Sequence, residues 1–328
     1  MQGIEKSFTS SVSTASFSSQ RCGTRLFSTF QPADPPGTHG TPVFADIDFS
    51  VASQPSAESK RRNHDPHAVF VVTGASRGIG LQFVKTLILR ARGSIVACCR
   101  SPEKAELLQE FIATLEDPRR IRIVSLDLED QTSIERAGAE IKEMFGRVDM
   151  LLNVAGLLGD AKTTPGPERS LAKVERDWFE KTLAINTIGP VMLSKELSPL
   201  MMQRRKRKSS DNDTETRAVA VIASLSARVG SISDNGLGGW YSYRMSKSAL
   251  NQATRTMALE MKRCSTWCIA LHPGTTDTDL SKPFQSNVKD GSLFPVDFTT
   301  EKLMNVIDSM TENNSGGLYD WAGQAISF

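Results

Sequence analysis

The fold is decided by the octapeptide Thr73-Gly74-Ala75-Ser76-Arg77-Gly78-Ile79-Gly80, which follows directly on a short apolar run. This run, Ala68–Thr73, reads AVFVVT and is typical of a strand buried on both faces. On the other side of the turn, Ile79–Arg92 carries apolar residues at helical spacing. We therefore expect a strand, a glycine-rich turn and a helix in immediate succession.

The glycines of this turn favour the binding of a phosphate group. Gly74 permits a tight turn, Gly78 lets the backbone approach an anion, and Gly80 lets the helix pack closely on the strand. The N-terminus of the following helix adds unpaired N–H groups and the positive end of its dipole. The strand before the turn and the helix after it are the context that distinguishes a dinucleotide-binding turn from a plain one.

Strand and helix patterns then alternate with short connections. We expect further strands near 94–100, 121–128, 148–154, 218–226, 268–272 and 317–321, and helices near 102–116, 132–145, 171–203, 240–263 and 301–310. This order predicts an α/β fold, a single doubly wound Rossmann-like domain over residues 67–328. It has a parallel sheet of about seven strands with helices on both faces. Ligands of such sheets bind beyond the carboxyl ends of the strands.

The first 66 residues differ from the rest in composition. Residues 1–31 are rich in Ser and Thr, carry several basic residues and contain a single acidic one, Glu5. This balance predicts a transit peptide for the mitochondrion or another organelle, with a disordered tail of a cytoplasmic protein as the alternative. Residues 32–66 are rich in Pro and Gly, and we expect a flexible linker.

Composition excludes several classes of function. The net charge is only +2, which argues against a nucleic-acid partner, and no apolar stretch is long enough for a membrane span. The five cysteines form no pair of CxxC motifs, so we expect neither a metal site nor a disulfide framework. The basic run 204–208 is interpreted as a solvated loop, and Ser281–Phe294 as a mobile lid over the substrate.

A tyrosine and a lysine four residues apart, Tyr243 and Lys247, are the strongest candidates for chemistry. On a helix they share one face, about 6 Å apart along its axis. A free tyrosine ionises at about pH 10, and we expect the neighbouring ammonium to favour the phenolate. Tyr243 would then exchange a proton with a carbonyl or an alcohol. Tyr241 has Met245 four residues later, so we assign it to packing or the pocket wall.

Together, the TGxxxGxG turn and the YxxxK pair resemble the signature of the short-chain dehydrogenase/reductase family, over residues 68–328. Two further stretches, LGGWYSYRMSK at Leu237–Lys247 and SGGLYDWAG at Ser315–Gly323, resemble the C-signal (C-factor) subgroup of carbonyl reductase-like proteins. The resemblance implies an oxidoreductase that uses a nicotinamide cofactor and acts on CH–OH or C=O groups.

The residue at the end of the second strand favours NADP(H). An acidic residue there would bind the ribose 2′-hydroxyl, whereas Arg100 suits a 2′-phosphate and Arg77 can add a second cation. Asn153–Gly156 resembles the NNAG motif of the family, with Val154 in place of the second Asn. The resemblance implies cofactor contacts by Thr73, Gly74, Ser76, Arg77, Gly78, Ile79, Gly80, Arg100, Asp127, Leu128, Asn153, Ala155, Gly156, Tyr243, Lys247, Pro273, Gly274, Thr276 and Thr278.

The resemblance also implies a serine that polarises the substrate carbonyl and a helix asparagine that holds a water beside the lysine. Family members place the serine three residues before a glycine, where this chain has Ala227, so we infer one inserted residue. Ser226, four residues before Gly230, is assigned to this role, with Ser224 as the alternative. Asn186 matches the asparagine.

The first functional hypothesis is an NADPH-dependent carbonyl reductase or alcohol dehydrogenase with a Ser-Tyr-Lys-Asn catalytic set. The alternative is an NADP(H)-binding signalling or sensor protein with little turnover, and a third is an epimerase or dehydratase. The expected partner is a small carbonyl or alcohol substrate, and the resemblance implies a homodimer or homotetramer. The sequence does not identify the substrate, because pocket specificity resides in loops.

Overall fold

The computed structural model describes residues 44–47, 55–159, 166–202 and 217–328. The predicted transit peptide 1–31 and the basic run 204–208 lie outside the described residues. None of the helices in the described part is long and apolar enough to cross a membrane. The same residues hold no group of three His, Cys, Asp or Glu side chains arranged for a metal ion.

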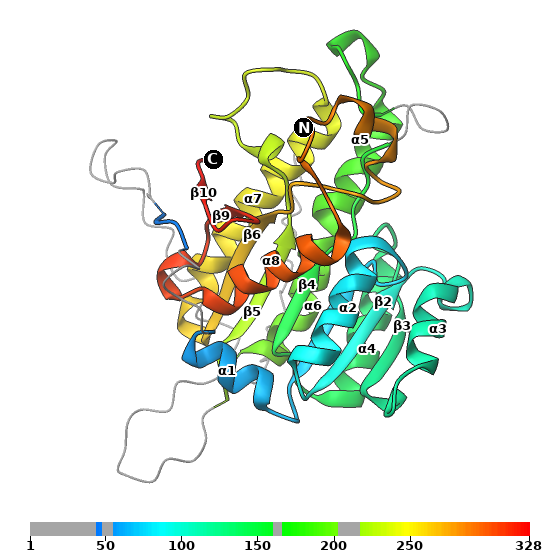
Figure 1. Cartoon of the computed structure of the whole chain (residues 1–328), viewed down its shortest axis with the longest axis vertical. Helices are drawn as coiled ribbons and strands as arrows, with labels where there is room; N and C mark the ends of the chain where they lie inside the picture. Colours follow the sequence, from blue (N-terminus) through cyan, green and yellow to red (C-terminus); the bar gives the residue numbers. More distant parts are fainter. Residues whose placement is uncertain (1–43, 48–54, 160–165, 203–216) are drawn as a thin grey trace, which may run out of the picture. The chain divides into compact units, whose positions relative to one another are not determined.

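The centre of the chain is a sheet of eight strands in the order β10-β9-β6-β5-β4-β1-β2-β3 (Figure 1). All neighbours pair in parallel except β10, which runs antiparallel to β9. This confirms the predicted fold and its parallel strands, and adds one short antiparallel strand at the edge. The strands are β1 (Val69–Thr73), β2 (Ser94–Cys99), β3 (Ile121–Ser125), β4 (Met150–Asn153), β5 (Ala220–Leu225), β6 (Thr266–His272), β9 (Leu318–Asp320) and β10 (Ala325–Ile326).

Helices cover both faces of this sheet, and each face has its own apolar core. One core joins the sheet to α2 (Gly78–Arg90), α3 (Glu106–Ala113) and α8 (Val296–Ser309). The other joins it to α4 (Gln131–Phe145), α6 (Gly189–Met201) and α7 (Tyr241–Met261). Figure 1 shows α2 and α8 side by side in front of the sheet. The burial of β1 on both sides is what its unbroken apolar run requires.

The helix expected over 171–203 is divided into segments. It consists of α5 (Arg176–Leu183), a π-helical turn (Ala184–Ile188) and α6, preceded by a short 3₁₀ turn. The lid segment is also partly regular, because β8 (Leu293–Phe294) pairs with β7 (Thr275–Thr276) after a 3₁₀ turn. The 3₁₀ turn before α5 is Leu171–Lys173, and the one before β8 is Lys282–Asn287. The other 3₁₀ turns in the described residues are Pro102–Lys104, Pro118–Arg120, Arg228–Gly230, Lys262–Cys264 and Glu312–Asn314.

The prediction of a flexible linker over residues 32–66 is wrong for the end of that range. The structure has helix α1 (Ala57–His64) there. Ser56 caps this helix, and its side chain accepts a hydrogen bond from Ser59 N at 3.2 Å. The helix docks through polar side chains, of which Ser59, Arg62 and Asn63 are buried. The sequence pattern missed it because α1 has no apolar stripe.

Asp308 of α8 receives the polar side chains of α1. Its carboxylate accepts hydrogen bonds from Ser59 Oγ and from Asn63 Nδ2, the latter at 3.3 Å. It also lies 3.7 Å from Arg62 Nη2 and 3.2 Å from Nη1 of Arg90 on α2. Burial lowers the pKa of Arg62, and Asp308 opposes that effect. A buried carboxylate thus ties the first described helix to the last.

A second docking segment, Phe44–Ile47, lies against the end of the chain. Its backbone bonds to the β9–β10 turn, where Ile47 N donates to Gly323 O at 2.8 Å. Asp46 accepts from Ala325 N at 2.7 Å. The Phe44 ring packs edge-on against Tyr319 at 6.4 Å between centroids. We call Phe44–Ile47 and α1 the N-terminal docking segments.

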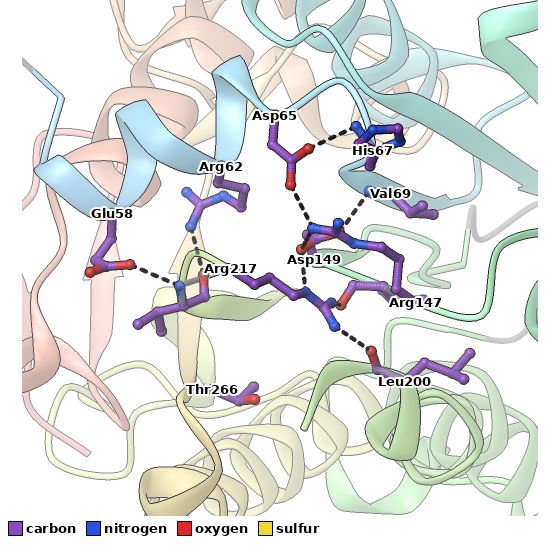
Figure 2. A network of polar contacts seen from close by, with 12 residues as sticks. Glu58, Arg62, Asp65, His67, Val69, Arg147, Asp149, Leu200, Arg217 and Thr266 are labelled. Atoms are coloured by element: carbon purple, nitrogen blue, oxygen red, sulfur yellow. Dashed lines mark hydrogen bonds and ion pairs between the residues drawn. The ribbon is translucent and has the colours of Figure 1, made fainter. Parts of the chain in front are cut away.

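A buried carboxylate, Asp149, organises the amino-terminal edge of the sheet (Figure 2). Only 1 % exposed, it accepts hydrogen bonds from Val69 N at 2.8 Å and Arg217 Nε at 2.7 Å. Arg147 donates to both of its oxygens, from Nε at 2.9 Å and Nη2 at 2.7 Å. Arg147 also reaches Asp65, just after α1, at 2.8 Å. Four donors therefore converge on one carboxylate at the edge opposite the carboxyl ends of the strands.

Candidate active site

A cavity of about 900 Å³ opens at the carboxyl ends of the central strands. The glycine turn, the ends of β2 to β5 and the face of α7 form its walls. Most of the predicted cofactor residues line it, namely Thr73, Gly74, Ser76, Arg77, Gly78, Ile79, Gly80, Arg100, Asp127, Leu128, Ala155, Gly156, Tyr243, Lys247, Pro273 and Thr278. This arrangement agrees with the expectation that these residues gather beyond the carboxyl ends of the strands.

Three predicted cofactor residues do not line the cavity. Asn153 is buried, and its Nδ2 donates to Ser194 Oγ and Ser224 Oγ, both at 3.4 Å. Thr276 is buried as well, with its hydroxyl 2.9 Å from that of Thr299. Gly274 is packed so closely on Phe294 that a Cβ atom would lie 2.7 Å from its ring. Asn153 and Gly274 instead adjoin the lining residues Val154 and Pro273 in the chain, and Thr276 packs on α8.

The glycine turn has the geometry of a phosphate cradle. Gly74 has φ +66°, and a Cβ atom there would lie 3.0 Å from Ala155 Cα. A Cβ atom on Gly80 would lie 2.2 Å from Gly74 O, so any larger residue would push helix and strand apart. No side chain caps the N-terminus of α2, which leaves its first N–H groups to the cavity. With Arg77 and Arg100 on the same walls, the residues present fit a dinucleotide that carries an additional phosphate.

Thr73 fixes the NNAG-like segment Asn153–Gly156, in which Val154 stands where the family has a second asparagine. Its Oγ1 accepts hydrogen bonds from Val154 N at 2.9 Å and Ala155 N at 3.1 Å. The backbone beside the cavity is therefore fixed from β1, and the side chain at position 154 is not needed for it. The departure from the family motif leaves this contact intact.

Tyr243 and Lys247 meet at the cavity on the face of α7. Lys247 is 4 % exposed, and its Nζ donates to Leu225 O at 2.7 Å. The same Nζ lies 5.6 Å from the centroid of the Tyr243 ring. Gly156 faces it, because a Cβ atom on that glycine would lie 3.8 Å from Nζ. The strand-end carbonyl and the close backbone thus direct the ammonium toward the cavity floor.

The pKa of Tyr243 moves in the direction opposite to our expectation. Burial of its hydroxyl raises it to about 12, and Lys247 does not offset this effect. Burial also lowers the pKa of Lys247 to about 8. The reason is that both groups are removed from water, which disfavours each charged form. The resting tyrosine is therefore a neutral hydroxyl, which suits the donation of a proton to a carbonyl oxygen.

The two serine candidates occupy different environments. Ser224 is fully buried beside Asn153, whereas Ser226 lines the cavity. However, Ser226 Oγ donates its single proton to Asn251 Oδ1 at 2.6 Å. Asn251 cannot easily reverse its amide, because its Nδ2 donates to Gly230 O at 3.2 Å. Donation from Ser226 to a substrate therefore requires its hydroxyl to rotate away from Asn251.

Asn186 occupies the π-helical turn and is fully buried. Its Oδ1 accepts from Leu157 N at 2.7 Å, and its Nδ2 donates to Leu157 O at 2.8 Å. Nδ2 also lies 3.1 Å from Ser246 Oγ on α7. The side chain thus joins the loop after β4 to α7, while its predicted role in holding a water stays a prediction. A mid-helix asparagine was the only sequence signal for this irregular turn.

Sequence reasoning missed several residues that line the cavity. Trp178 of α5 is the largest of them and is 5 % exposed. Its indole fills the space beside Gly166, where a Cβ atom would lie 2.0 Å from Nε1. Cys99, Ile185 and Leu280 also line the cavity. In the sequence, Trp178 is one apolar position of an amphipathic helix, so no pattern distinguishes it from an ordinary core residue.

Comparison with known proteins identifies the family. A family model described as short chain dehydrogenase matches residues 68–289. The chain belongs to the short-chain dehydrogenase family. Carbonyl reductase from chicken fatty liver, solved with NADPH bound, has a similar structure, with a TM-score of 0.68 and 28 % identity over 80 % of this chain and 99 % of the other. Carbonyl reductase Sniffer of Drosophila melanogaster is similar at a TM-score of 0.68 and 26 % identity, over 80 % of this chain and 100 % of that one.

A short-chain dehydrogenase relative also matches the predicted subgroup. C-signal of Myxococcus xanthus is 30 % identical over 181 residues, which cover 55 % of this chain and 93 % of C-signal. Both docking segments precede residue 68, where the family match begins. They are therefore additions to the part of the chain that the family defines.

Proposed function

We propose that this short-chain dehydrogenase is an NADPH-dependent carbonyl reductase that transfers hydride between nicotinamide and a carbonyl or alcohol substrate. The observation that carries the proposal is the convergence of Tyr243 and Lys247 on the cavity that the glycine turn also lines. Three features at one edge of the sheet support it, namely a phosphate cradle, a tyrosine hydroxyl that can donate a proton and a buried ammonium.

The cofactor preference rests on charge. Arg77 and Arg100 line the cavity, and β2 ends at Cys99 and is followed by Arg100, with no carboxylate at either position. The chicken carbonyl reductase is described as NADPH bound, which agrees with this preference. The bound cofactor would supply the hydride. The Arg77 side chain is 70 % exposed, and its Nη1 lies 3.4 Å from Asp279 Oδ2. Arg77 would therefore break this ion pair when it contacts a phosphate.

The protein residues would then handle the proton and the orientation of the substrate. Tyr243 gives its hydroxyl proton to the carbonyl oxygen as negative charge develops there. Lys247 holds its ammonium beneath the ring and restores the proton after turnover. Ser226 rotates from Asn251 and donates to the same oxygen, and Asn186 keeps the loop after β4 fixed against α7.

The second hypothesis is an NADP(H)-binding signalling or sensor protein with little turnover, and its support is the similarity to C-signal. A panel of aldehydes and ketones distinguishes the reductase from the sensor. NADPH oxidation is followed by the absorbance of reduced nicotinamide at about 340 nm, and NADPH binding is measured separately. Turnover that Tyr243→Phe abolishes without loss of NADPH binding supports the reductase. Tight NADPH binding with no oxidation on any carbonyl contradicts it and supports the sensor.

We also propose that residues 1–31 direct the chain to mitochondria and that residues 67–328 form the catalytic domain as a homodimer or homotetramer. The support for targeting is compositional. Fusion of residues 1–31 to a fluorescent protein tests it, and a diffuse cytoplasmic signal would contradict it. Light scattering of the full chain measures the oligomeric state.

A further inference from the structure

Trp240 lies immediately before α7 in a backbone conformation that tryptophan rarely adopts. Its φ and ψ are 55° and 43°, in the left-handed region. Within the described residues, only one other non-glycine residue, Ser265, has a positive φ. Gly238 and Gly239 precede Trp240, each with φ 67°, and glycine accepts this conformation at little cost. The chain thus places its largest side chain where a third glycine would be unstrained.

The strained backbone is held from several sides. Trp240 N donates to Glu168 O at 2.5 Å, and Arg244 N donates to Trp240 O at 2.8 Å. The Arg244 guanidinium donates to Gly239 O at 3.0 Å and Gly238 O at 3.2 Å. The surrounding structure therefore over-determines this conformation, as is typical of strain retained at functional sites.

The helix does not need the indole for its own capping. The buried carboxylate of Glu168 accepts hydrogen bonds from Ser242 N and Ser242 Oγ, which satisfies the start of α7. The backbone contacts of Trp240 would be available to any residue, glycine included. The reason for a tryptophan must therefore lie in its side chain.

The indole of Trp240 packs against the ring of Tyr243. Its centroid lies 6.1 Å from that of the Tyr243 ring, at an interplanar angle of 74°. It also lies 5.6 Å from the ring of Phe284, in the segment between β7 and β8. Both Trp240 and Phe284 stay partly exposed. Leu280, 42 % exposed, adds an apolar side chain on the wall of the same cavity as Tyr243.

We propose that Trp240 is a specificity-determining residue whose indole, held between Tyr243 and Phe284, receives the ring of an aryl ketone or aryl aldehyde. The proposal rests on the proposed carbonyl reductase function. Aromatic rings prefer the edge-on and offset arrangements that this pair offers, beyond what burial of apolar area gives. A substrate ring packed there places its attached carbonyl beside Tyr243. A short aliphatic carbonyl compound would reach Tyr243 without using the indole.

The test separates ring recognition from turnover. Acetophenone and 2-butanone are titrated by calorimetry onto the full chain saturated with NADP⁺, which cannot deliver hydride to a ketone. Trp240→Gly removes the indole and relieves the strain, and we expect it to weaken acetophenone binding about tenfold and 2-butanone binding less than twofold. Trp240→Phe should restore most of the acetophenone affinity. Ser265→Gly relieves the same kind of backbone strain at the start of β6 and should change neither affinity.

Thermal unfolding of the same variants decides whether the indole is structural. Trp240→Gly relieves the backbone strain but also removes the ring contacts with Tyr243 and Phe284, so the two effects oppose each other. We expect its melting temperature, like that of Ser265→Gly, to stay within about 4 °C of the wild type. The proposal would be overturned by equal losses of affinity for both ketones or by undetectable acetophenone binding to the wild type. A melting temperature lowered by more than about 6 °C only in Trp240→Gly would also overturn it, because the indole would then be mainly structural. Acetophenone binding that depends on Trp240, with no reduction of any carbonyl by NADPH, would instead contradict the proposed function alone.

Discussion

Replacing Asp149 by asparagine should destabilise the protein without weakening cofactor binding. The carboxylate accepts two hydrogen bonds at each oxygen, Oδ1 from Arg147 and Arg217 and Oδ2 from Arg147 and Val69. An amide has one oxygen, so in either orientation its NH₂ group faces two donors. Asp149→Asn therefore loses two hydrogen bonds and the negative charge between two guanidinium groups.

Each hydrogen bond to a charged group contributes about 1.5–3 kcal/mol. The arginine side chains are 23 % and 20 % exposed, so water replaces part of what is lost. We expect a loss of about 3 kcal/mol, at the lower end for a broken buried ion pair. In a domain of this size that corresponds to a melting temperature lower by about 6–12 °C.

The assay is thermal and urea unfolding followed by circular dichroism, with NADPH affinity measured in parallel. Glu180→Gln is the matched control, because Glu180 pairs with Arg176 at 2.7 Å on the surface, with side chains 57 % and 86 % exposed. Such a pair contributes less than about 1 kcal/mol. If Asp149→Asn melts within about 2 °C of Glu180→Gln, the four converging donors do not stabilise the sheet edge as we infer. A weakened NADPH affinity would show that the two edges are coupled.

Three further predictions concern the cavity and the N-terminal docking segments. Because burial lowers the pKa of Lys247 to about 8, carbonyl reduction should fall as pH rises through that value, when the ammonium is lost. Lys247→Arg should be less active but flat to about pH 10, since arginine stays charged, and an unchanged pH profile would exclude Lys247 as the titrating group. Arg100→Ala should weaken NADPH binding about 10- to 100-fold and leave NADH binding unchanged, because only NADPH carries the 2′-phosphate; a parallel loss for both cofactors would refute this preference. A chain that begins at residue 66 should melt at least about 5 °C below one that begins at residue 44, because it lacks the partners of Asp308 on α1. Equal melting temperatures would mean that the docking segments contribute nothing.

The sheet and the pairing of Tyr243 with Lys247 could be predicted from the sequence because each depends on a short-range pattern. Strands such as β1 are unbroken apolar runs, and Tyr243 and Lys247 share a face of α7 through their spacing alone. The glycine turn was recognisable because its context, strand before and helix after, is also local. These features need no knowledge of which distant residue lies opposite.

The features that the sequence did not predict depend on partners far along the chain. Helix α1 has no apolar stripe, so its stability became clear only when Asp308 was placed against it. The hydrogen bond from Ser226 to Asn251 crosses from β5 to α7, and it changes how that serine can act. The raised pKa of Tyr243 reflects burial, a tertiary property that outweighed the adjacent lysine.

The docking of the N-terminal segments orders events during synthesis of the chain. Ser59 and its acceptor Asp308 are 249 residues apart, and Asp46 and Ala325 are 279 apart. Both docking segments therefore leave the ribosome long before the surfaces to which they bind. Until α8 and the β9–β10 turn have emerged and folded, α1 has nothing to dock on and cannot hold its polar side chains in a buried position. During translation the N-terminal docking segments are thus open to chaperones and proteases until α8 and the β9–β10 turn have been made.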